Sequence, residues 1–326
     1  SGLHKIRHKS GTYLFRCENS LGPAPLPAGI PRHSARRLVV RRLHPVLSTP
    51  MNDTTLAFIG GGNMASSLIG GLIADGWDPA RIRVADASTQ QLERLSQRFP
   101  VTTTTDNRSA IAQANIIVLA VKPQSMQAVA QELASASSLQ QSLVISIAAG
   151  IREATLRNWL GAGTAIVRTM PNTPAMVQSG ATALFANPAV SDEQRSIAES
   201  ILRAVGLAIW VDDEALMDAV TALSGSGPAY FFLFMESLQQ AGCELGLPVK
   251  TARLLALQTA FGAAKMALES TEDAATLRQR VTSPGGTTER AIAVLQEGGF
   301  EALISKALQA AAARSRELAD KFGRDS

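Results

Sequence analysis

The chain has 326 residues, of which 46% are hydrophobic and 18% are charged, as expected for a globular protein with room for two domains. Its formal net charge of +4 comes from the first fifty residues. These residues hold nine of the 31 basic side chains and one of the 27 acidic side chains. Residues 51–326 therefore have 22 basic and 26 acidic side chains, a net charge of −4. A mildly acidic body is a poor match for nucleic acid, and no apolar stretch approaches the ~20 residues of a membrane helix, so we expect neither partner.

Residues 1–50 differ in composition from everything that follows. They are rich in arginine and proline and show no sustained apolar period, and Met51 follows them as a natural start would. We predict a largely disordered leader that was added for expression or translated from upstream. An Arg-rich, acid-poor mitochondrial transit peptide is the alternative.

The positions of histidine and cysteine exclude several kinds of site. All four histidines lie in the leader, which disfavours a histidine triad, a histidine general base or a His-ligated metal in the body. The two cysteines, Cys17 and Cys243, offer neither a metal motif nor a disulfide framework. We therefore expect a reducing compartment, the cytoplasm, and no bound metal.

From residue 51 to about residue 211, short apolar runs alternate with helical periods. Strands are predicted at 56–59, 81–85, 116–121, 143–147 and 165–168, and helices at 64–75 and 90–99. Continuous apolar runs are typical of strands that are covered on both faces. Because alternating strands and helices imply parallel crossovers, we predict an α/β Rossmann domain over residues 51–211, with a doubly wound, mainly parallel sheet.

Residues 212–326 have the composition of helices. Helices are predicted at 217–223, 229–245, 250–270, 287–296 and 300–322, and together they predict an all-α domain for substrate binding and dimerisation. The second of them contains Tyr230, Phe231, Phe232 and Phe234, more apolar surface than one helix face can hide. We expect it to be buried on several sides, either in a bundle or against a second subunit.

A glycine-rich turn joins the first predicted strand to the first predicted helix. In Gly60-x-Gly62-x-x-Ala65 the first glycine permits a tight turn, the second lets the backbone approach a pyrophosphate, and Ala65 allows close helix–strand packing. The helix start adds free N–H groups and a positive dipole end. Alone the pattern also fits a structural turn. With a strand before it, a helix after it and a second strand about 20 residues on, it predicts a nicotinamide dinucleotide site.

Asp86 ends the second predicted strand, where a carboxylate binds the ribose hydroxyls of NADH and repels the 2′-phosphate of NADPH. Ser88, Thr89 and Arg83 could instead serve a phosphate, and Asp86 is equally suited to a plain turn. The sequence leaves the choice between NADPH and NADH open.

Further loops follow the later strands. Ala120-Val121-Lys122-Pro123 and Ala148-Ala149-Gly150 end the third and fourth, where small residues let a nicotinamide lie against the backbone. Lys122 is suited either to a cofactor oxygen or to solvent. The loop 168–174 contains two prolines, which stiffen it as the edge of a site requires.

Two loops stand out in the helical part. The segment 224–230, Ser-Gly-Ser-Gly-Pro-Ala-Tyr, is a small-residue elbow that places Pro228 in a first helical turn. The segment 283–289, Ser-Pro-Gly-Gly-Thr-Thr-Glu, is a glycine turn at a helix start. Its amides and hydroxyls suit a carboxylate as small as that of an amino acid; the alternative is a capping turn without a ligand.

Taken in order, these segments resemble pyrroline-5-carboxylate reductase. The resemblance runs from about Thr54 to the C-terminus and is most specific at 281–288, Val-Thr-Ser-Pro-Gly-Gly-Thr-Thr. It implies reduction of 1-pyrroline-5-carboxylate to L-proline by NADPH or NADH, the final step of proline biosynthesis. It also implies a Rossmann domain followed by a helical dimerisation domain, in a homodimer and often in a decamer built from dimers.

The same resemblance implies roles for single residues. Thr288 would be the catalytic residue at the substrate nitrogen, while Ser283 and the Gly286–Thr287 backbone would hold the substrate carboxylate. Glu214 would add a further carboxylate on the substrate side. The family commonly has a basic or hydroxyl-rich stretch after the second strand, which 86–88, Asp-Ala-Ser, fits only in part. The cofactor would contact Ile59, Gly60, Gly61, Gly62, Asn63, Met64, Asp86, Ser88, Asn107, Ala120, Val121, Lys122, Pro123, Ala149 and Gly150.

A cyclic imine suits a body without histidine, because its nitrogen is basic enough to be protonated before hydride arrives. Two other functions compete. A β-hydroxyacid dehydrogenase would use a helical lysine followed four residues later by asparagine, and no body lysine at 250, 265, 306 or 321 has that partner. A non-catalytic NAD(P)-binding sensor would keep the glycine turn but need no anion site.

Overall fold

The structure, a computed structural model, describes residues 54–324, so the leader predicted for residues 1–50 lies outside the described residues. The described chain forms two compact units. One consists of the residues up to Phe234 together with those from Gly299 onward, and the other is Met235–Gly298. The smaller unit is therefore inserted in sequence between two parts of the larger one.

An eight-stranded sheet forms the centre of the larger unit, in the order β3-β2-β1-β4-β5-β6-β7-β8. Neighbouring strands are parallel throughout except for β6 and β7, which are antiparallel. The prediction of a doubly wound, mainly parallel sheet is confirmed. The strands are β1 (Leu56–Ile59), β2 (Ile82–Ala85), β3 (Thr102–Thr104), β4 (Ile116–Leu119), β5 (Leu143–Ser146), β6 (Ala165–Met170), β7 (Gly180–Ala186) and β8 (Gly206–Trp210).

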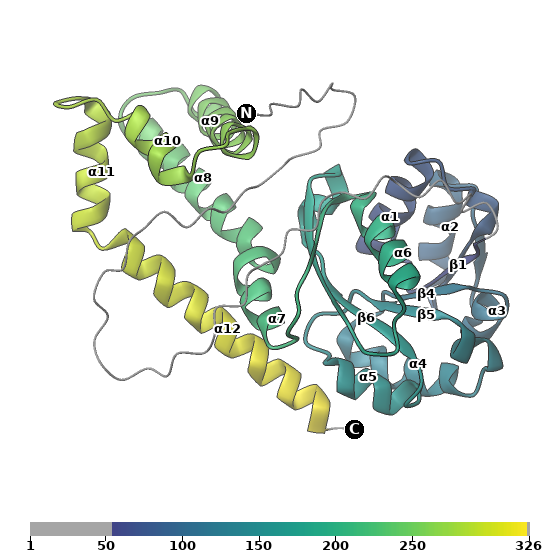
Figure 1. Cartoon of the computed structure of the whole chain (residues 1–326). Coiled ribbons are helices and arrows are strands. Elements are labelled where there is room, and N and C mark those ends of the chain that lie inside the picture. The colour runs from purple at the N-terminus through teal and green to yellow at the C-terminus, as the bar shows by residue number, and fades with distance from the viewer. Residues whose placement is uncertain (1–53, 325–326) are drawn as a thin grey trace, which may run out of the picture. The chain divides into compact units, whose positions relative to one another are not determined.

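Helices cover both faces of this sheet, as Figure 1 shows. Alternate residues of the central strands enter two separate cores, with Phe58 and Val118 in one and Ile59 and Leu119 in the other. Burial on both faces explains why these strands are continuously apolar in sequence. The first core is covered by α1 (Asn63–Ala74), α2 (Thr89–Arg98) and α6 (Asp192–Arg203), and the second by α3 (Asn107–Ile111), α4 (Pro123–Ala134) and α5 (Glu153–Leu160).

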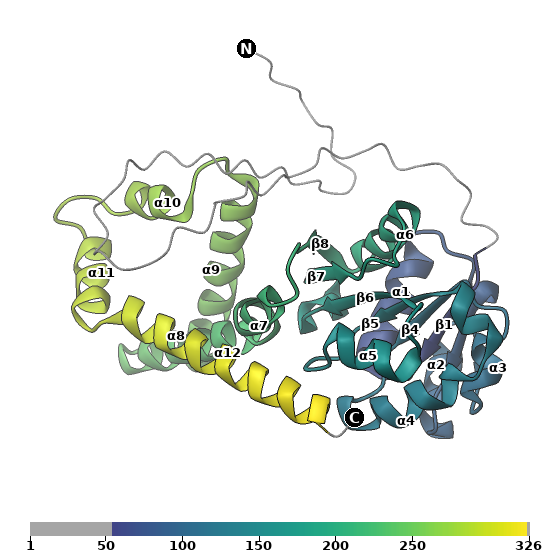
Figure 2. The same cartoon turned by 60° about the horizontal axis from the view of Figure 1, so that its bottom comes forward.

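The last helix of the chain belongs to the larger unit. α12 (Phe300–Arg324) packs against α7 (Leu216–Val220) and the π-helical turn η5 (Thr221–Gly225), and both views show α12 alongside α7 (Figures 1 and 2). The buried Ser315 Oγ donates to Asp218 Oδ1 at 2.6 Å, and Arg152 pairs with Asp320 at 2.7 Å. These two interactions fix α12 to residues far earlier in the chain: Asp218 lies 97 positions before Ser315, and Arg152 lies farther still from Asp320.

The smaller unit consists of helices only. α8 (Gly227–Glu244) leads into it, and α9 (Val249–Glu269), α10 (Ala274–Arg280) and α11 (Thr287–Glu297) follow, joined by loops that Figure 2 shows. All five helices predicted beyond residue 212 are present. None of the helices within residues 54–324 combines the length and the apolar character needed to cross a bilayer.

Many large apolar side chains of these helices remain in contact with solvent. Phe231 on α8 and Phe261 on α9 are 64% and 62% exposed. Of the two explanations offered by the sequence for such apolar helices, burial in a bundle of the same chain does not account for these residues. Burial against a second subunit, the other explanation, stays a prediction.

Candidate cofactor and substrate sites

The glycine turn leaves β1 with a backbone that favours glycine. Gly60 has φ +101°, and a Cβ placed on it would lie 2.7 Å from the carbonyl carbon of Ala120. The Gly60 N–H donates to Ala85 O at 2.7 Å, and the Ala120 N–H donates to Ile59 O at 2.7 Å. The ends of β1, β2 and β4 therefore meet at this turn, and any side chain at position 60 would disturb all three.

The other side of the turn is open. Nothing lies within 4 Å of the position that a Cβ on Gly62 would occupy, and Gly62 is the residue that caps α1. The amides in the first turn of α1, from Asn63 on, have no partners within the helix. Free amides at the positive end of a helix dipole, next to unobstructed space, fit the diphosphate of a dinucleotide.

Asp86 fastens this turn to the end of β2. Its Oδ2 accepts from the Gly61 N–H at 2.7 Å, and its Oδ1 accepts from the Ser88 N–H at 2.8 Å. Both oxygens are thereby held by backbone, and each keeps a further lone pair that can accept another hydrogen bond. The sequence predicts that Asp86 contacts the cofactor. The structure shows that its carboxylate also holds the backbone of the glycine turn.

Gln91 completes the support and was not predicted. Its Nε2 donates to Gly61 O at 2.7 Å, while its own N–H donates to Ser88 Oγ at 3.3 Å. Ser88-x-x-Gln91 has the sequence of a capping box, in which the Gln side chain would return to the Ser88 N–H. Here Asp86 takes that N–H, and the Gln91 side chain turns to the glycine loop instead.

The remaining predicted cofactor residues follow β4 and β5. Lys122 is exposed and precedes α4, whose first residue is Pro123; Ala149 is exposed, and Gly150 is buried with φ +75°. Because β1, β2, β4 and β5 are parallel, these loops emerge at the same edge of the sheet as Gly60 and Asp86. Ligands of open α/β sheets bind at that edge, where the strand order reverses between β1 and β4.

Asn107, also predicted at the cofactor, is held by α4. Its Nδ2 donates to Glu132 Oε2 at 2.9 Å, and Asn107 is the first residue of α3. The sequence did not predict this contact, because Glu132 lies 25 positions from Asn107 and no motif connects the two residues.

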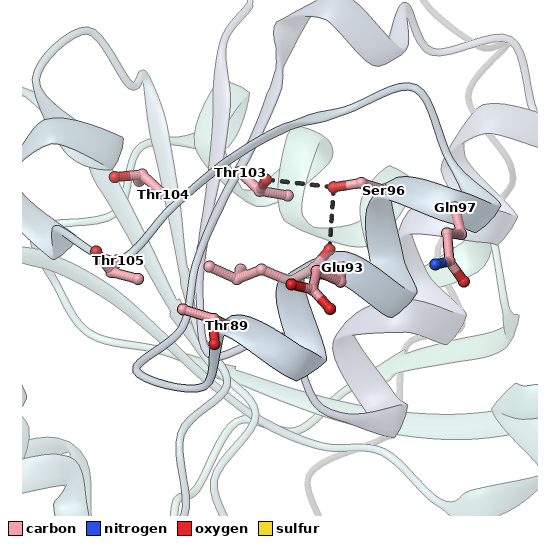
Figure 3. Close-up of a pocket in the computed structure, with 8 residues that line it drawn as sticks. Thr89, Glu93, Ser96, Gln97, Thr103, Thr104 and Thr105 are labelled. Atoms are coloured by element: carbon pink, nitrogen blue, oxygen red, sulfur yellow. Dashed lines mark hydrogen bonds between the residues drawn. The ribbon is translucent and has the colours of Figure 1, made fainter.

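A hollow of about 530 Å³ lies between α2 and β3, beside the end of β2 (Figure 3). In it, Ser96 Oγ donates to Leu92 O at 3.0 Å and lies 3.3 Å from Thr103 Oγ1. The hollow is hydroxyl-rich and contains one carboxylate, that of Glu93. It is lined by Thr89, Leu92, Glu93, Ser96, Gln97, Thr103, Thr104 and Thr105.

Glu214, predicted on the substrate side, has a structural partner in the larger unit. Its Oε1 accepts from Arg168 Nη1 at 2.7 Å and from the Glu153 N–H, at the start of α5, also at 2.7 Å. Arg168 is buried, and a buried guanidinium needs such a partner. Glu214 therefore compensates Arg168, and its role toward the substrate stays a prediction.

The two loops 168–174 and 224–230 contact each other. Asn172 Nδ2 donates to Ser224 O and to Ser224 Oγ, both at 3.3 Å, and Asn172 Oδ1 accepts from the Ala181 N–H at 2.9 Å. A Cβ on Gly225 would collide with the methyl group of Met170. Pro228 is the second residue of α8, in the first turn as predicted.

The predicted substrate turn lies in the smaller unit. Gly285 has φ +71°, its N–H donates to Glu289 Oε2 at 2.7 Å, and the Gly286 N–H donates to Ser283 O at 3.0 Å. These two amides are thus occupied by the turn itself. The donors left for a carboxylate are the first-turn amides of α11, from Thr287 on, and the hydroxyls of Ser283, Thr287 and Thr288. Thr288 is half-buried and Thr287 is exposed.

Two family models match the chain. One, described as pyrroline-5-carboxylate reductase dimerisation, covers residues 214–318, and the other, described as NADP oxidoreductase coenzyme F420-dependent, covers residues 55–150. The chain is also similar to the pyrroline-5-carboxylate reductase of Pseudomonas aeruginosa, with 53% identity over 273 residues, 84% of this chain and 100% of that protein. The enzyme of Pasteurella multocida is 43% identical over 276 residues, 83% of this chain and 100% of the relative.

Solved structures give the same result. A pyrroline-5-carboxylate reductase from Coxiella burnetii has 50% identity and a TM-score of 0.79, over 82% of this chain and 99% of that one. The Plasmodium falciparum pyrroline carboxylate reductase with NADP bound has 29% identity and a TM-score of 0.73, over 82% and 99% of the two chains.

Proposed function

The chain belongs to the pyrroline-5-carboxylate reductase family, and we propose that it performs the family's reaction with the residues described above. It is an NAD(P)H-dependent reductase that converts 1-pyrroline-5-carboxylate into L-proline, the final step of proline biosynthesis. The observation that carries this conclusion is the 53% identity to a named reductase over the whole length of that enzyme.

The larger unit provides the cofactor site. Gly60, Gly61 and Gly62 with the start of α1 would hold the diphosphate, and Asp86, Ser88 and Asn107 would lie toward the adenosine. The loops 120–123 and 149–150 would lie along the rest of the dinucleotide. The bound cofactor supplies the hydride, and these residues hold it in place. The fastening of Gly61 by Asp86 and Gln91 supports this assignment, because a preorganised turn loses little freedom on binding.

The turn 283–288 would bind the substrate. Ser283 and the backbone at Gly286 and Thr287 would hold the carboxylate, and the Thr288 hydroxyl would contact the ring nitrogen. With Gly286 N–H already directed at Ser283 O, we assign the larger share of this binding to the first-turn amides of α11. Glu214 would add a negative charge on the substrate side, favourable for a protonated imine.

Catalysis would then depend mainly on orientation. A protonated C=N group accepts two electrons and a hydrogen at carbon, which leaves a neutral secondary amine, so the protein needs no strong acid at the moment of transfer. Thr288 would orient the nitrogen, and the two sites would hold the reacting carbons in attack geometry. The absence of histidine from residues 51–326 is compatible with this chemistry.

We propose the division of labour given by the sequence, with residues 51–211 for the cofactor and 212–326 for substrate and dimerisation. The two family models match within these ranges, at 55–150 and 214–318. The chain carries a dimerisation domain, and the exposed phenylalanines of α8 and α9 support a homodimer. Assembly into a decamer, action in the cytoplasm and the absence of nucleic-acid and membrane partners are further parts of the proposal.

One assay tests the function. The purified full chain is mixed with NADH or NADPH, and absorbance at 340 nm is followed before and after addition of 1-pyrroline-5-carboxylate, with proline measured at the end. We expect oxidation that depends on the imine and yields proline in equal amount. A β-hydroxyacid substrate supporting the same turnover, or cofactor binding without any turnover, would contradict the proposal.

A further inference from the structure

The cofactor preference that the sequence leaves open can be argued from the surroundings of Asp86. This step depends on the proposed function, since it takes the glycine turn to be the NAD(P)H site. The carboxylate follows β2, the position from which Rossmann domains contact the adenosine ribose. Its two hydrogen bonds, 2.7 Å to the Gly61 N–H and 2.8 Å to the Ser88 N–H, prevent it from rotating away from an incoming ligand.

Such a fixed carboxylate favours one of the two cofactors. The free lone pairs on its oxygens can accept hydrogen bonds from the ribose 2′- and 3′-hydroxyls of NADH. The 2′-phosphate of NADPH would bring close to two negative charges to the same place. A carboxylate that is already bonded to the pyrophosphate turn cannot move aside without loosening that turn.

Arg83 and Arg98 have other hydrogen-bond partners, and Lys122 lies on a more distant strand end. Arg83 Nη2 donates at 2.9 Å to Gln113, which precedes β4 and so lies at the opposite edge of the sheet. Arg98 Nη1 donates at 2.9 Å to Ser66 Oγ on α1. Lys122 follows β4, two strands away from β2 in the sheet order, which corresponds to ~10 Å at the usual strand spacing.

The hollow beside β2 does not supply a cation either. Figure 3 shows Thr89, Glu93, Ser96 and the three threonines of β3 and its following loop around it. Its lining contains the carboxylate of Glu93 and no basic side chain, and Arg94, the next residue on α2, is not part of it. The lining of the hollow therefore supplies no positive charge that would offset the Asp86 carboxylate.

We propose that Asp86 makes this enzyme prefer NADH to NADPH. The Plasmodium falciparum relative was solved with NADP bound at 29% identity, so the preference is inferred for this chain and not for the family. A like-charge contact at the protein surface corresponds to roughly a tenfold to hundredfold discrimination.

The test measures turnover and binding separately. kcat/KM is determined for NADH and NADPH with saturating imine, and calorimetry gives the Kd of 5′-AMP and of 2′,5′-ADP, which differ by the 2′-phosphate. We expect NADH to be preferred by about tenfold or more, 5′-AMP to bind more tightly than 2′,5′-ADP, and both differences to shrink as salt is raised. A higher kcat/KM for NADPH together with tighter binding of 2′,5′-ADP would overturn the proposal.

Two variants assign the effect to Asp86. Asp86→Asn keeps an oxygen for one backbone N–H and removes the charge, so the NADH/NADPH ratio should move toward NADPH by about tenfold. Ala87→Arg adds a cation and leaves both Asp86 hydrogen bonds in place, so it should move the ratio the same way even if the first variant folds poorly. Glu93→Gln is the control, because it removes a carboxylate of the hollow without touching the turn, and we expect a change below about threefold.

If the NADH/NADPH ratio of kcat/KM were unchanged in both Asp86→Asn and Ala87→Arg, the role of Asp86 in the cofactor preference would be refuted. The proposed function fails in a different way: neither cofactor would be oxidised on addition of the imine, whatever the two nucleotides bind.

Discussion

The two compact units provide their candidate sites in different ways. In the larger unit the glycine turn rests on buried strands and is tied down by Ala85, Asp86 and Gln91, all within one chain. In the smaller unit the turn 283–288 lies among mostly exposed residues, and only Ala252 and Ala256 are buried among those described there. The proposed cofactor site is therefore preorganised in a single chain, whereas the proposed substrate turn has few packed neighbours within that chain.

This difference indicates which functions need assembly. The glycine turn rests on a core formed within one chain, so we expect it to bind its ligand whatever the oligomeric state. The turn 283–288 lies among helices with exposed phenylalanines and leucines, so we expect it to become rigid only when a second copy of the chain covers those helices. Substitutions in the two units are expected to separate cofactor binding from turnover.

The largest effect is expected from Gly60→Ala. The new Cβ would meet the Ala120 carbonyl carbon at 2.7 Å, on a residue with φ +101°, so strain and overlap together should cost about 2–4 kcal/mol of folding free energy. NADH binding, followed by its fluorescence, should weaken at least ~100-fold. Gly76→Ala is the matched control, since Gly76 has φ +97° but nothing within 4 Å of its Cβ position. It should lose some stability and retain cofactor binding; equal loss of binding in both variants would contradict the role of the Gly60 contact.

Thr288→Ala should leave cofactor binding intact and lower kcat by about 100-fold, because it removes the hydroxyl assigned to the ring nitrogen. Steady-state kinetics and NADH titration check this. Thr282→Ala removes another hydroxyl of the same loop, one that donates to Arg278 O at 2.6 Å, and should change kcat by less than about twofold. Normal turnover in Thr288→Ala would remove this residue from the mechanism.

Phe261→Glu tests the dependence on assembly. The side chain is 62% exposed in the single chain, so a charge there costs the monomer little but would be buried in a dimer. Sedimentation should show dissociation, with about a tenfold or greater loss of kcat/KM and an unchanged Kd for NADH. Lys250→Gln, on the same helix α9, makes the same change of one unit in charge without altering an apolar contact. If Phe261→Glu remained fully associated, α9 would not be part of the interface.

The smallest effect is expected from Gln91→Ala. It removes the hydrogen bond to Gly61 O and leaves Asp86 in place, so NADH should bind about three- to tenfold more weakly, with kcat unchanged. Gln90→Ala is the neighbouring control on α2. A loss of turnover without weaker NADH binding would show that Gln91 does not act through the turn.

The sequence predicted those parts of the fold that depend on local patterns. The central strands are continuous apolar runs, and five helices beyond residue 212 have a clear period, so these elements were found with ends within a few residues. The strand β3 is three threonines at the sheet edge, with no apolar alternation, and was missed. The seven-residue helix α10 and the strands β7 and β8, which begin with glycines, were missed for similar reasons.

The site was predictable where a motif carries the chemistry and not where distant residues support it. Gly60, Asp86 and Thr288 stand out by position in a pattern. Arg168 and Glu214 are 46 residues apart, and no spacing rule connects them. Ser88-x-x-Gln91 matches the capping-box pattern, which predicts a contact from the Gln91 side chain to the Ser88 N–H. Because Asp86 accepts from that N–H, the Gln91 side chain contacts Gly61 O instead.

The return of α12 to the larger unit has a consequence for synthesis of the protein. The Rossmann strands leave the ribosome long before α12 does, so Asp218 and Arg152 obtain their partners Ser315 and Asp320, and the second core obtains Phe322, only after α12 has been made. Until then the nascent chain exposes a surface of the first-made unit that α12 will cover. A premature stop codon after residue 298 would leave that surface permanently bare, so such truncated chains should depend on chaperones or aggregate even though every strand of the sheet has been made.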